Sequence, residues 1–359
     1  MLRLPVRKGG GDAACARRNI TFDKRFNESR WYRLKAGGID LDQTALPRRL
    51  HAPLRKRKIR NVLGRFRRNW DLYLMMVPVL LYFILFEYVP MYGVQIAFKD
   101  FIATKGIDGS PWVGLKHFNR FYESFYFWRL IKNTIGIGVY ELLVGFPIPI
   151  LLALMIHELR SRLLQRIVQT VTYAPHFLST VVVVGMLFLF LSPQTGLVNQ
   201  MLQFVGMEPI SFMTNPVWFK TVYVFSGVWQ TMGWSSIIYL AALTGVDPQL
   251  VEASRVDGAS RLRRVWHIHL PTIAPTIIIL LILNIGRLLS VGFEKVFLMQ
   301  NPLNLATSDV IATHVYRTGI VEAQYSYSAA VGLFNAVICF IMLVVVNQIA
   351  RKVNETSLW

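Results

Sequence analysis

The sequence predicts an all-α membrane protein with six membrane-spanning helices, and three observations lead to that prediction. First, 53% of the 359 residues are hydrophobic, 16% are charged and the mean hydropathy is +0.40, which is more apolar than a soluble core can bury. Second, the apolar residues gather in runs of about 20, the length that crosses a ~30 Å hydrocarbon layer as a helix. Third, residues 1–70 hold 20 of the 39 Lys and Arg but 5 of the 20 Asp and Glu.

The first 70 residues form a basic tail without sustained apolar periodicity. They mix Gly, Lys and Arg and end in a basic stretch from Arg55 to Arg68. This composition is typical of disorder, so we expect a largely disordered cytoplasmic arm that is attracted to anionic lipid headgroups and binds no nucleic acid. The first 30 residues lack the apolar run of a secretory signal, so the run from Leu72 is expected to serve as both targeting signal and anchor.

Residues 71–359 are expected to form one transmembrane domain. A soluble fold cannot bury six apolar runs of this length in one chain. The ends of the predicted spans are given to within about four residues. The two cysteines, Cys15 and Cys339, lie at opposite ends of the chain, which argues against a disulfide framework or a cysteine metal cluster. The predicted spans are 72–97, 133–156, 167–191, 217–243, 272–293 and 328–350.

The distribution of Lys and Arg predicts the orientation of the spans, because these residues are retained on the cytoplasmic side. An even number of spans puts both termini on one side. With the termini inside, the inner segments hold 29 Lys and Arg and the outer segments hold eight. Six of those eight lie in 98–132, so the first outer loop is more basic than the rule favours. We therefore expect both termini in the cytoplasm.

The inner connection between spans four and five, residues 244–271, is long and patterned. Asp247 followed by Pro248 is typical of an N-cap with proline at the first helical position, which begins a helix that continues to Val256. Gly258 allows a break, and a second helical stretch runs from Ala259 to His269 before Pro271, which ends it or begins span five. The pattern predicts a helix, a glycine turn and a second helix at the inner face of the membrane.

The spacing within this connection resembles the EAA loop of the membrane subunits of bacterial ABC importers. Glu252-Ala253-Ser254 is followed after three residues by Gly258, after nine more by Ile268, and after one more by Leu270-Pro271. Ser254 departs from the alanine that is usual in the family. Further segments are similar to permeases that import oligosaccharides, and they lie at Tyr88 to Gly93, Pro175-His176-Phe177, Gly196 to Asn199, Phe293 to Phe297 and Tyr325 to Ser328. The tail 1–70 is not covered by the resemblance.

The resemblance implies a permease subunit in the bacterial cytoplasmic membrane that imports carbohydrate by alternating access. It implies a second and different permease, cytoplasmic ATPase subunits and an extracytoplasmic solute-binding protein as partners. The helix from Pro248 would be the coupling helix that sits in a cleft of the ATPase, with contacts from Glu252, Ala253, Ser254, Asp257, Gly258 and Ala259. No Gly-x-x-x-x-Gly-Lys-Ser/Thr loop occurs in the sequence, so ATP and Mg would be bound by the separate ATPase, and this chain would hold no cofactor and catalyse no reaction. Taken alone, the same residues also fit an ordinary helix that ends at a C-cap glycine.

Polar side chains inside the spans are candidates for a solute path, since they are costly in lipid and tend to face a cavity or a neighbouring helix. In span four they recur at helical spacing, and in span five a second stripe is expected on one helical face. Aromatic rings and hydrogen-bonding groups of this kind suit a sugar. The candidates are Tyr223, Ser226, Gln230 and Trp234 in span four, Asn284, Arg287, Ser290 and Glu294 in span five, Asn335 in span six and Glu141 in span two.

Two interpretations of these stripes stay open. In the first, Glu141 or Glu294 neutralises Arg287 within the chain and the stripes are helix packing. In the second, Arg287 meets the carboxylate of an acidic sugar. Rival functions are an importer of another small solute, such as an amino acid or a phosphodiester, and an ion-gradient-driven carrier, which would not require the patterned loop. An intramembrane enzyme is disfavoured, because His157-Glu158 lacks a second histidine at zinc spacing, and His267 and His269 lie on different helical faces.

Overall fold

The computed structural model describes residues 68–354, and the regular elements among them are helices, with two isolated β-bridges at 99–112 and 102–106. Of the basic tail predicted for residues 1–70, residues 1–67 lie outside the described part of the chain. Within the described part, four continuous helical stretches are long and apolar enough to cross a membrane. They are Trp70–Phe98, Phe127–His157, Arg261–Gly286 and Tyr325–Lys352. The all-helical membrane protein predicted from the sequence is therefore confirmed at this level.

The first stretch is a composite helix made of α2 (Trp70–Phe83), η1 (Ile84–Tyr88), α3 (Val89–Met91) and η2 (Tyr92–Phe98). Its π-turn at η1 precedes Pro90, whose ring nitrogen cannot donate to the preceding turn. None of the residues of α2 is buried within this chain. Such an apolar helix needs lipid or another protein to cover it.

The second stretch joins α5 (Phe127–Gly145) to α6 (Pro147–His157) with no break between them. Pro147 is tolerated at the junction because the first helical positions need no backbone donor. Both halves pack against α10 (Pro216–Leu243). The predicted span 133–156 is thus confirmed as a helix that begins six residues earlier.

The third predicted span is not the single helix expected over 167–191. It consists of α7 (Arg162–Tyr173), η3 (Ala174–Phe177) and α8 (Thr180–Phe190), with a bend of 100° between the two arms. Pro175 interrupts the hydrogen-bond ladder, and the backbone is extended at Leu178 and Ser179. The side chain of Ser179 then caps α8 by accepting a hydrogen bond from the backbone N–H of Val182 at 3.3 Å.

The fourth predicted span, 217–243, coincides with α10, which runs for 28 residues from Pro216. Asn215 caps it and accepts a hydrogen bond from the N–H of Val217 at 3.0 Å. This helix is not one of the four stretches that are long and apolar enough to cross a membrane. Its sequence includes Lys220, Gln230 and several Ser and Thr, so its lower hydropathy reflects polar side chains and not a shorter helix.

The fifth predicted span, 272–293, is wrong at both ends. The helix begins at Arg261 with α12 (Arg261–Arg264), passes through the π-turn η4 (Val265–His269) and continues as α13 (Leu270–Gly286). Pro271 does not stop it, because it occupies the start of α13, after the wide turn of η4. At the other end the helix stops at Gly286, although Leu288, Leu289 and Val291 continue the apolar run.

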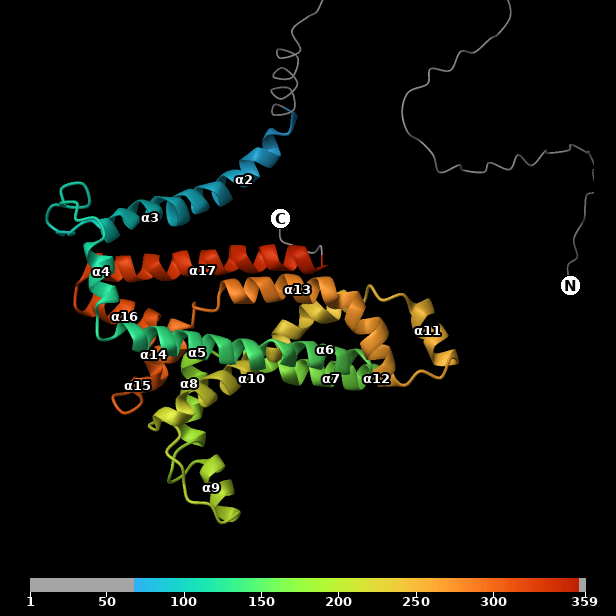
Figure 1. The fold of residues 1–359 in the computed structure, drawn as a ribbon. Coiled ribbons are helices and arrows are strands. Elements are labelled where there is room, and N and C mark those ends of the chain that lie inside the picture. The colour runs from blue at the N-terminus through green and yellow to red at the C-terminus, as the bar shows by residue number, and fades with distance from the viewer. Residues whose placement is uncertain (1–67, 355–359) are drawn as a thin grey trace, which may run out of the picture. The chain divides into compact units, whose positions relative to one another are not determined.

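The remaining elements are short helices and one long final helix, α17 (Tyr325–Asn354), which runs beside α13 (Figure 1). Three apolar clusters hold the bundle together, and two of them include residues of α10. The short helices are α4 (Lys116–Tyr122), α9 (Leu197–Phe204), α11 (Pro248–Val256), α14 (Phe293–Met299), α15 (Leu305–Ser308), α16 (Ile311–Tyr316) and η5 (Arg317–Val321). The packing places α10 between the α5–α6 rod, α7 and α13.

Candidate functional site

The connection between α10 and α13 forms the helix, glycine turn and helix that the sequence predicts. Asp247 caps α11 by accepting a hydrogen bond from the N–H of Gln249 at 2.9 Å, and Pro248 is the first helical residue. The helix ends at Val256. Gly258 has φ +73°, a left-handed conformation that favours glycine, and Ser260 then caps the next helix. These local features are confirmed residue by residue.

The residues predicted to contact an ATPase lie together on this element. Glu252, Ala253, Asp257 and Gly258 are exposed, while Ser254 and Ala259 are half-buried. The hydroxyl of Ser254 donates to the carbonyl of Val251 at 2.7 Å, so serine is accommodated inside the helix where the family has alanine. Large apolar side chains beside them are also exposed, and these are Leu250, Val256, Leu262 and Trp266. An exposed surface that mixes apolar and charged groups is suited to a protein partner.

A buried ion-pair cluster holds the start of the second helix. Glu158, just after α6, accepts a hydrogen bond from the guanidinium of Arg264 at 2.9 Å and lies 3.0 Å from Nε2 of His269. Arg264 also donates to the carbonyl of Ala259 at 3.0 Å. Burial alone would raise the pKa of Glu158, but the hydrogen bonds from Arg264 and His269 outweigh it and hold the pKa below its usual range.

This Glu158 cluster joins two segments that are more than 100 residues apart in the sequence. Arg264 and His269 are buried, so a carboxylate left without them would lose its charged partners in a poorly hydrated place. Sequence reasoning missed this cluster, because neither Glu158 nor Arg264 belongs to a local pattern that indicates the other. His267, by contrast, is exposed, which confirms that the two histidines occupy different helical faces.

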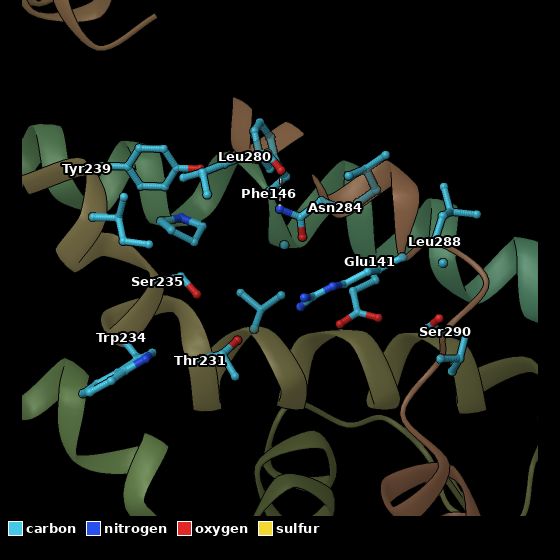
Figure 2. Close-up of a pocket in the computed structure, with 18 of the residues that line it drawn as sticks. Glu141, Phe146, Thr231, Trp234, Ser235, Tyr239, Leu280, Asn284, Leu288 and Ser290 are labelled. Atoms are coloured by element: carbon cyan, nitrogen blue, oxygen red, sulfur yellow. Dashed lines mark hydrogen bonds between the residues drawn. The ribbon is translucent and has the colours of Figure 1, made fainter. Parts of the chain in front are cut away.

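A cavity of about 610 Å³ lies between α5, α6, α10 and α13. Figure 2 shows the polar ends of Glu141, Thr231 and Asn284 directed into the same space. The wall is apolar at Phe146 and Pro149 and at Ile237 and Ile238 of α10. Its main polar and aromatic residues are Glu141, Thr231, Trp234, Ser235, Tyr239, Asn284, Arg287 and Ser290.

Five of the predicted path residues line this cavity, and they are Glu141, Trp234, Asn284, Arg287 and Ser290. Arg287 is exposed there, and its guanidinium has no hydrogen bond or ion pair with any residue that the structure describes. The interpretation in which Glu141 or Glu294 neutralises Arg287 by direct pairing is therefore wrong for the described chain. Glu141 lines the same cavity and has no ion pair within 4 Å among the described residues.

The other predicted path residues lie elsewhere. Tyr223 and Ser226 are buried in the packing of α10, and the amide of Gln230 donates to the carbonyl of Leu178 at 2.9 Å. Asn335 lies on α17 with its carbonyl oxygen buried and without a hydrogen-bond partner among the described residues. The stripe expected along span five is wrong as a helical face, since the helix ends at Gly286 and Glu294 belongs to α14.

A stacked pair of rings borders the cavity and was not anticipated. His176, in the bend between α7 and α8, lies parallel to Trp234 with ring centroids 4.6 Å apart and planes 9° from parallel. Gly233 lets the two elements approach, since an added Cβ would lie 2.1 Å from the carbonyl oxygen of Thr172. The bend thus covers one face of the Trp234 ring.

The described residues contain no group of three or more His, Cys, Asp or Glu arranged to hold a metal. A multi-span helical protein with an exposed helical connection and a polar cavity among its helices has the architecture of a transporter's membrane subunit. The geometry defines that class and supplies no catalytic constellation within the described chain.

Comparison with known proteins identifies the family. The chain belongs to the binding-protein-dependent transport system inner membrane components, whose family model matches residues 145–355. It is therefore a non-catalytic permease component of an ABC importer and a multi-pass protein of the bacterial inner membrane, with ATP hydrolysis supplied by a separate subunit. The resemblance seen in the EAA loop is confirmed.

Particular relatives are similar over most of the chain. The polygalacturonan/rhamnogalacturonan transport system permease protein YteP of Bacillus subtilis (strain 168) is 45% identical over 305 residues, covering 85% of this chain and 95% of YteP. Protein LplB of the same organism is 44% identical, covering 82% and 92%. The crystal structure of a bacterial ABC transporter involved in the import of the acidic polysaccharide alginate includes a chain that is 42% identical, with a TM-score of 0.76 over 82% of this chain and 99% of that one.

Proposed function

We propose that this chain is the permease subunit of an ATP-driven importer for acidic oligosaccharides. The observation that carries the proposal is Arg287, a cation without a partner among the described residues, in a cavity that also offers Trp234 and Asn284. An unpaired guanidinium is suited to bind a carboxylate, and an indole ring is suited to stack on a sugar ring. Relatives named for polygalacturonan and alginate transport support the same substrate class.

The proposed topology has six spans with both termini in the cytoplasm. The bent pair of α7 and α8 would be the third span and α10 the fourth, in addition to the four helices that are long and apolar enough alone. Tolerance of a bent or polar helix inside a bundle supports this assignment, because neighbouring helices and a cavity cover its polar groups. Residues 1–70 would then be a basic cytoplasmic arm.

We further propose that α11 docks into the separate ATPase, which binds ATP and Mg. The contact would be made by the exposed surface around Glu252, Ala253, Ser254, Asp257, Gly258 and Ala259. A second and different permease would cover apolar surface such as that of α2, and an extracytoplasmic binding protein would deliver the sugar. The alginate importer, whose structure includes an alginate pentasaccharide-bound periplasmic protein, supports this assembly.

In this mechanism, ATP binding closes the ATPases and moves the two coupling elements together. The Glu158 cluster passes the movement to α6, and the continuous helix from Arg261 passes it to the cavity. A rigid helix transmits a displacement as one body, so the cavity can alternate between the two sides.

The first experiment measures sugar-stimulated ATP hydrolysis in proteoliposomes that contain this chain, its partner permease, the ATPases and the binding protein. A galacturonate trisaccharide is expected to stimulate hydrolysis, and Glu252→Ala is expected to abolish the stimulation. Gln249→Ala, on the same helix, serves as the matched control. Stimulation by amino acids but not sugars, or transport that follows an ion gradient and ignores Glu252, would overturn the proposal.

A further inference from the structure

Two lysines outside the cavity stand close together without a counter-charge. Lys220 on α10 is half-buried, and an added Cβ at Gly136 of α5 would lie 2.8 Å from its Nζ, so the ammonium rests against the backbone of α5. Lys132 lies four residues before Gly136 on α5, so it shares the helical face against which Lys220 rests. Both side chains are positive, so they repel each other.

Neither lysine has a hydrogen bond or ion pair with any residue in the described part of the chain. Two arginines on neighbouring segments, by contrast, share one buried acid. Arg129 and Arg317 both contact the buried carboxylate of Asp309, at 2.8 and 3.1 Å. The Lys132–Lys220 pair is therefore an uncompensated concentration of positive charge, and an anion between the two would replace repulsion by attraction.

The position of Lys220 connects this pair to the cavity. Lys220 precedes Thr231 by 11 residues and Trp234 by 14, close to three and four helical turns, so the three side chains share one face of α10. Thr231 and Trp234 line the cavity, and Lys220 lies roughly 16 Å farther along the helix toward Pro216.

A third cation stands on the same face between them. The Nζ of Lys295 lies 3.2 Å from where a Cβ would be at Gly227, which is seven residues after Lys220. It donates to the carbonyl of Tyr223 at 3.0 Å, lies 4.9 Å from the centroid of the Tyr223 ring, and has the carboxylate of Glu141 within electrostatic range. This face of α10 therefore carries two cations, of which Lys295 has an acid nearby and Lys220 has no ion pair among the described residues.

We propose that Lys220 and Lys132 form an anion subsite that holds a carboxylate of the acidic sugar chain before, or while, its neighbouring unit occupies the cavity. This inference rests on the proposed function and extends it to a second carboxylate position, about three helical turns from Thr231 toward the outer end of α10. A lipid phosphate would satisfy the same two ammonium groups, so the experiment distinguishes the two sources.

The test uses the complete importer in proteoliposomes at saturating binding protein. Initial uptake rates are measured for a galacturonate trisaccharide and for its carboxyl-reduced, neutral counterpart. Lys220→Gln is expected to lower the rate for the charged sugar about tenfold, the effect of losing one charge-assisted hydrogen bond, and to change the rate for the neutral sugar less than twofold. Lys220→Arg keeps the charge and is expected to retain most of the charged uptake.

Two further variants keep the result interpretable. Lys132→Gln changes an exposed side chain and is expected to lower charged uptake about threefold with the same selectivity. Lys105→Gln removes an exposed cation of the first outer loop and is the matched control, expected to alter neither rate. Equal losses on both sugars, or no loss on either, would overturn the subsite while leaving the proposed function intact. Failure of the wild-type importer to take up the charged sugar would overturn both.

Lipid composition distinguishes the second source of the anion. The measurements are repeated in vesicles of phosphatidylcholine alone and in vesicles that also contain phosphatidylglycerol. An effect of Lys220→Gln that is the same in both, and limited to the charged sugar, supports the sugar carboxylate. An effect that appears for both sugars, and only with phosphatidylglycerol, would assign the pair to a lipid phosphate and overturn the proposal.

Discussion

The two ends of the α12–α13 helix differ in whether their charged side chains are paired within the chain. At the cytoplasmic end of the proposed topology, Arg264 and His269 are buried and share the carboxylate of Glu158. At the cavity end, Arg287 is exposed and has no ionic partner within the described residues. Charges that are paired within the chain fix two segments to one another, whereas charges left unpaired in a cavity are available to a ligand. In the proposed mechanism, the paired end transmits movement and the unpaired end selects cargo.

The largest effect is expected from breaking the paired end. Glu158→Gln leaves Arg264 without a counter-charge, and removing one member of a buried ion pair costs about 3 kcal/mol. The thermal midpoint of the purified complex should fall, and sugar uptake should fall further than ATP hydrolysis because the inner segments no longer move together. Glu123→Gln changes an exposed acid whose side chain has no partner among the described residues, and it is the control. Unchanged stability would contradict the role given to the cluster.

Gly138→Ala is expected to have the next largest effect. Gly138 lines the cavity, and an added Cβ would lie 2.1 Å from the carbonyl oxygen of Leu288, so the turn that follows α13 must shift. Overpacking of this kind costs about 2 kcal/mol and would displace the neighbouring Arg287. Uptake and thermal stability should both fall. Gly185→Ala on α8 meets nothing within 4 Å and should leave stability equal or slightly higher.

Arg287→Gln tests whether the unpaired arginine at the cavity end serves the ligand or the fold. Because the Arg287 guanidinium has no partner among the described residues, its loss should change the free energy of unfolding by less than about 0.5 kcal/mol. Uptake of a charged oligosaccharide should fall about tenfold, the loss of one charge-assisted contact, and uptake of a neutral one should fall less. Equal losses on both sugars, or a large loss of stability, would show that Arg287 supports the fold instead.

The pH dependence of stability is the smallest expected effect. Since the pKa of Glu158 in the folded chain lies below its usual value of 4.5, its contribution to stability is fully present above that value and is lost as the pH falls through the folded pKa. The thermal midpoint of the wild-type complex should therefore fall more steeply below about pH 5 than that of Glu158→Gln. Parallel curves for the two proteins would contradict the assignment.

Features that depend on neighbouring residues were predictable from the sequence. The start of α11 follows from Asp247 and Pro248, and the break after it follows from Gly258, because caps and left-handed turns need particular residues at particular positions. The spacing around Glu252 was sufficient to identify the family, which the comparisons confirm.

Features set by tertiary packing were not predictable in the same way. The end of span five lies inside an apolar run, and hydropathy does not report that the Leu288 carbonyl packs on Gly138 of another helix. The bend at Pro175 was also missed, since the apolar residues continue on both sides of it. The pairing of Glu158 with Arg264 joins segments with no shared local pattern.

The continuous helix Arg261–Gly286 has a mechanical consequence. Its 26 residues span roughly 39 Å and connect the turn beside the docking surface directly to the residues of the cavity. When this helix tilts as one body, the Glu158 cluster near its first turn is the point about which it rotates. A tilt of about 5° at one end displaces the other by roughly 3 Å, the length of one hydrogen bond. In the proposed mechanism, small movements of the ATPase would thus be sufficient to make or break sugar contacts at the far end.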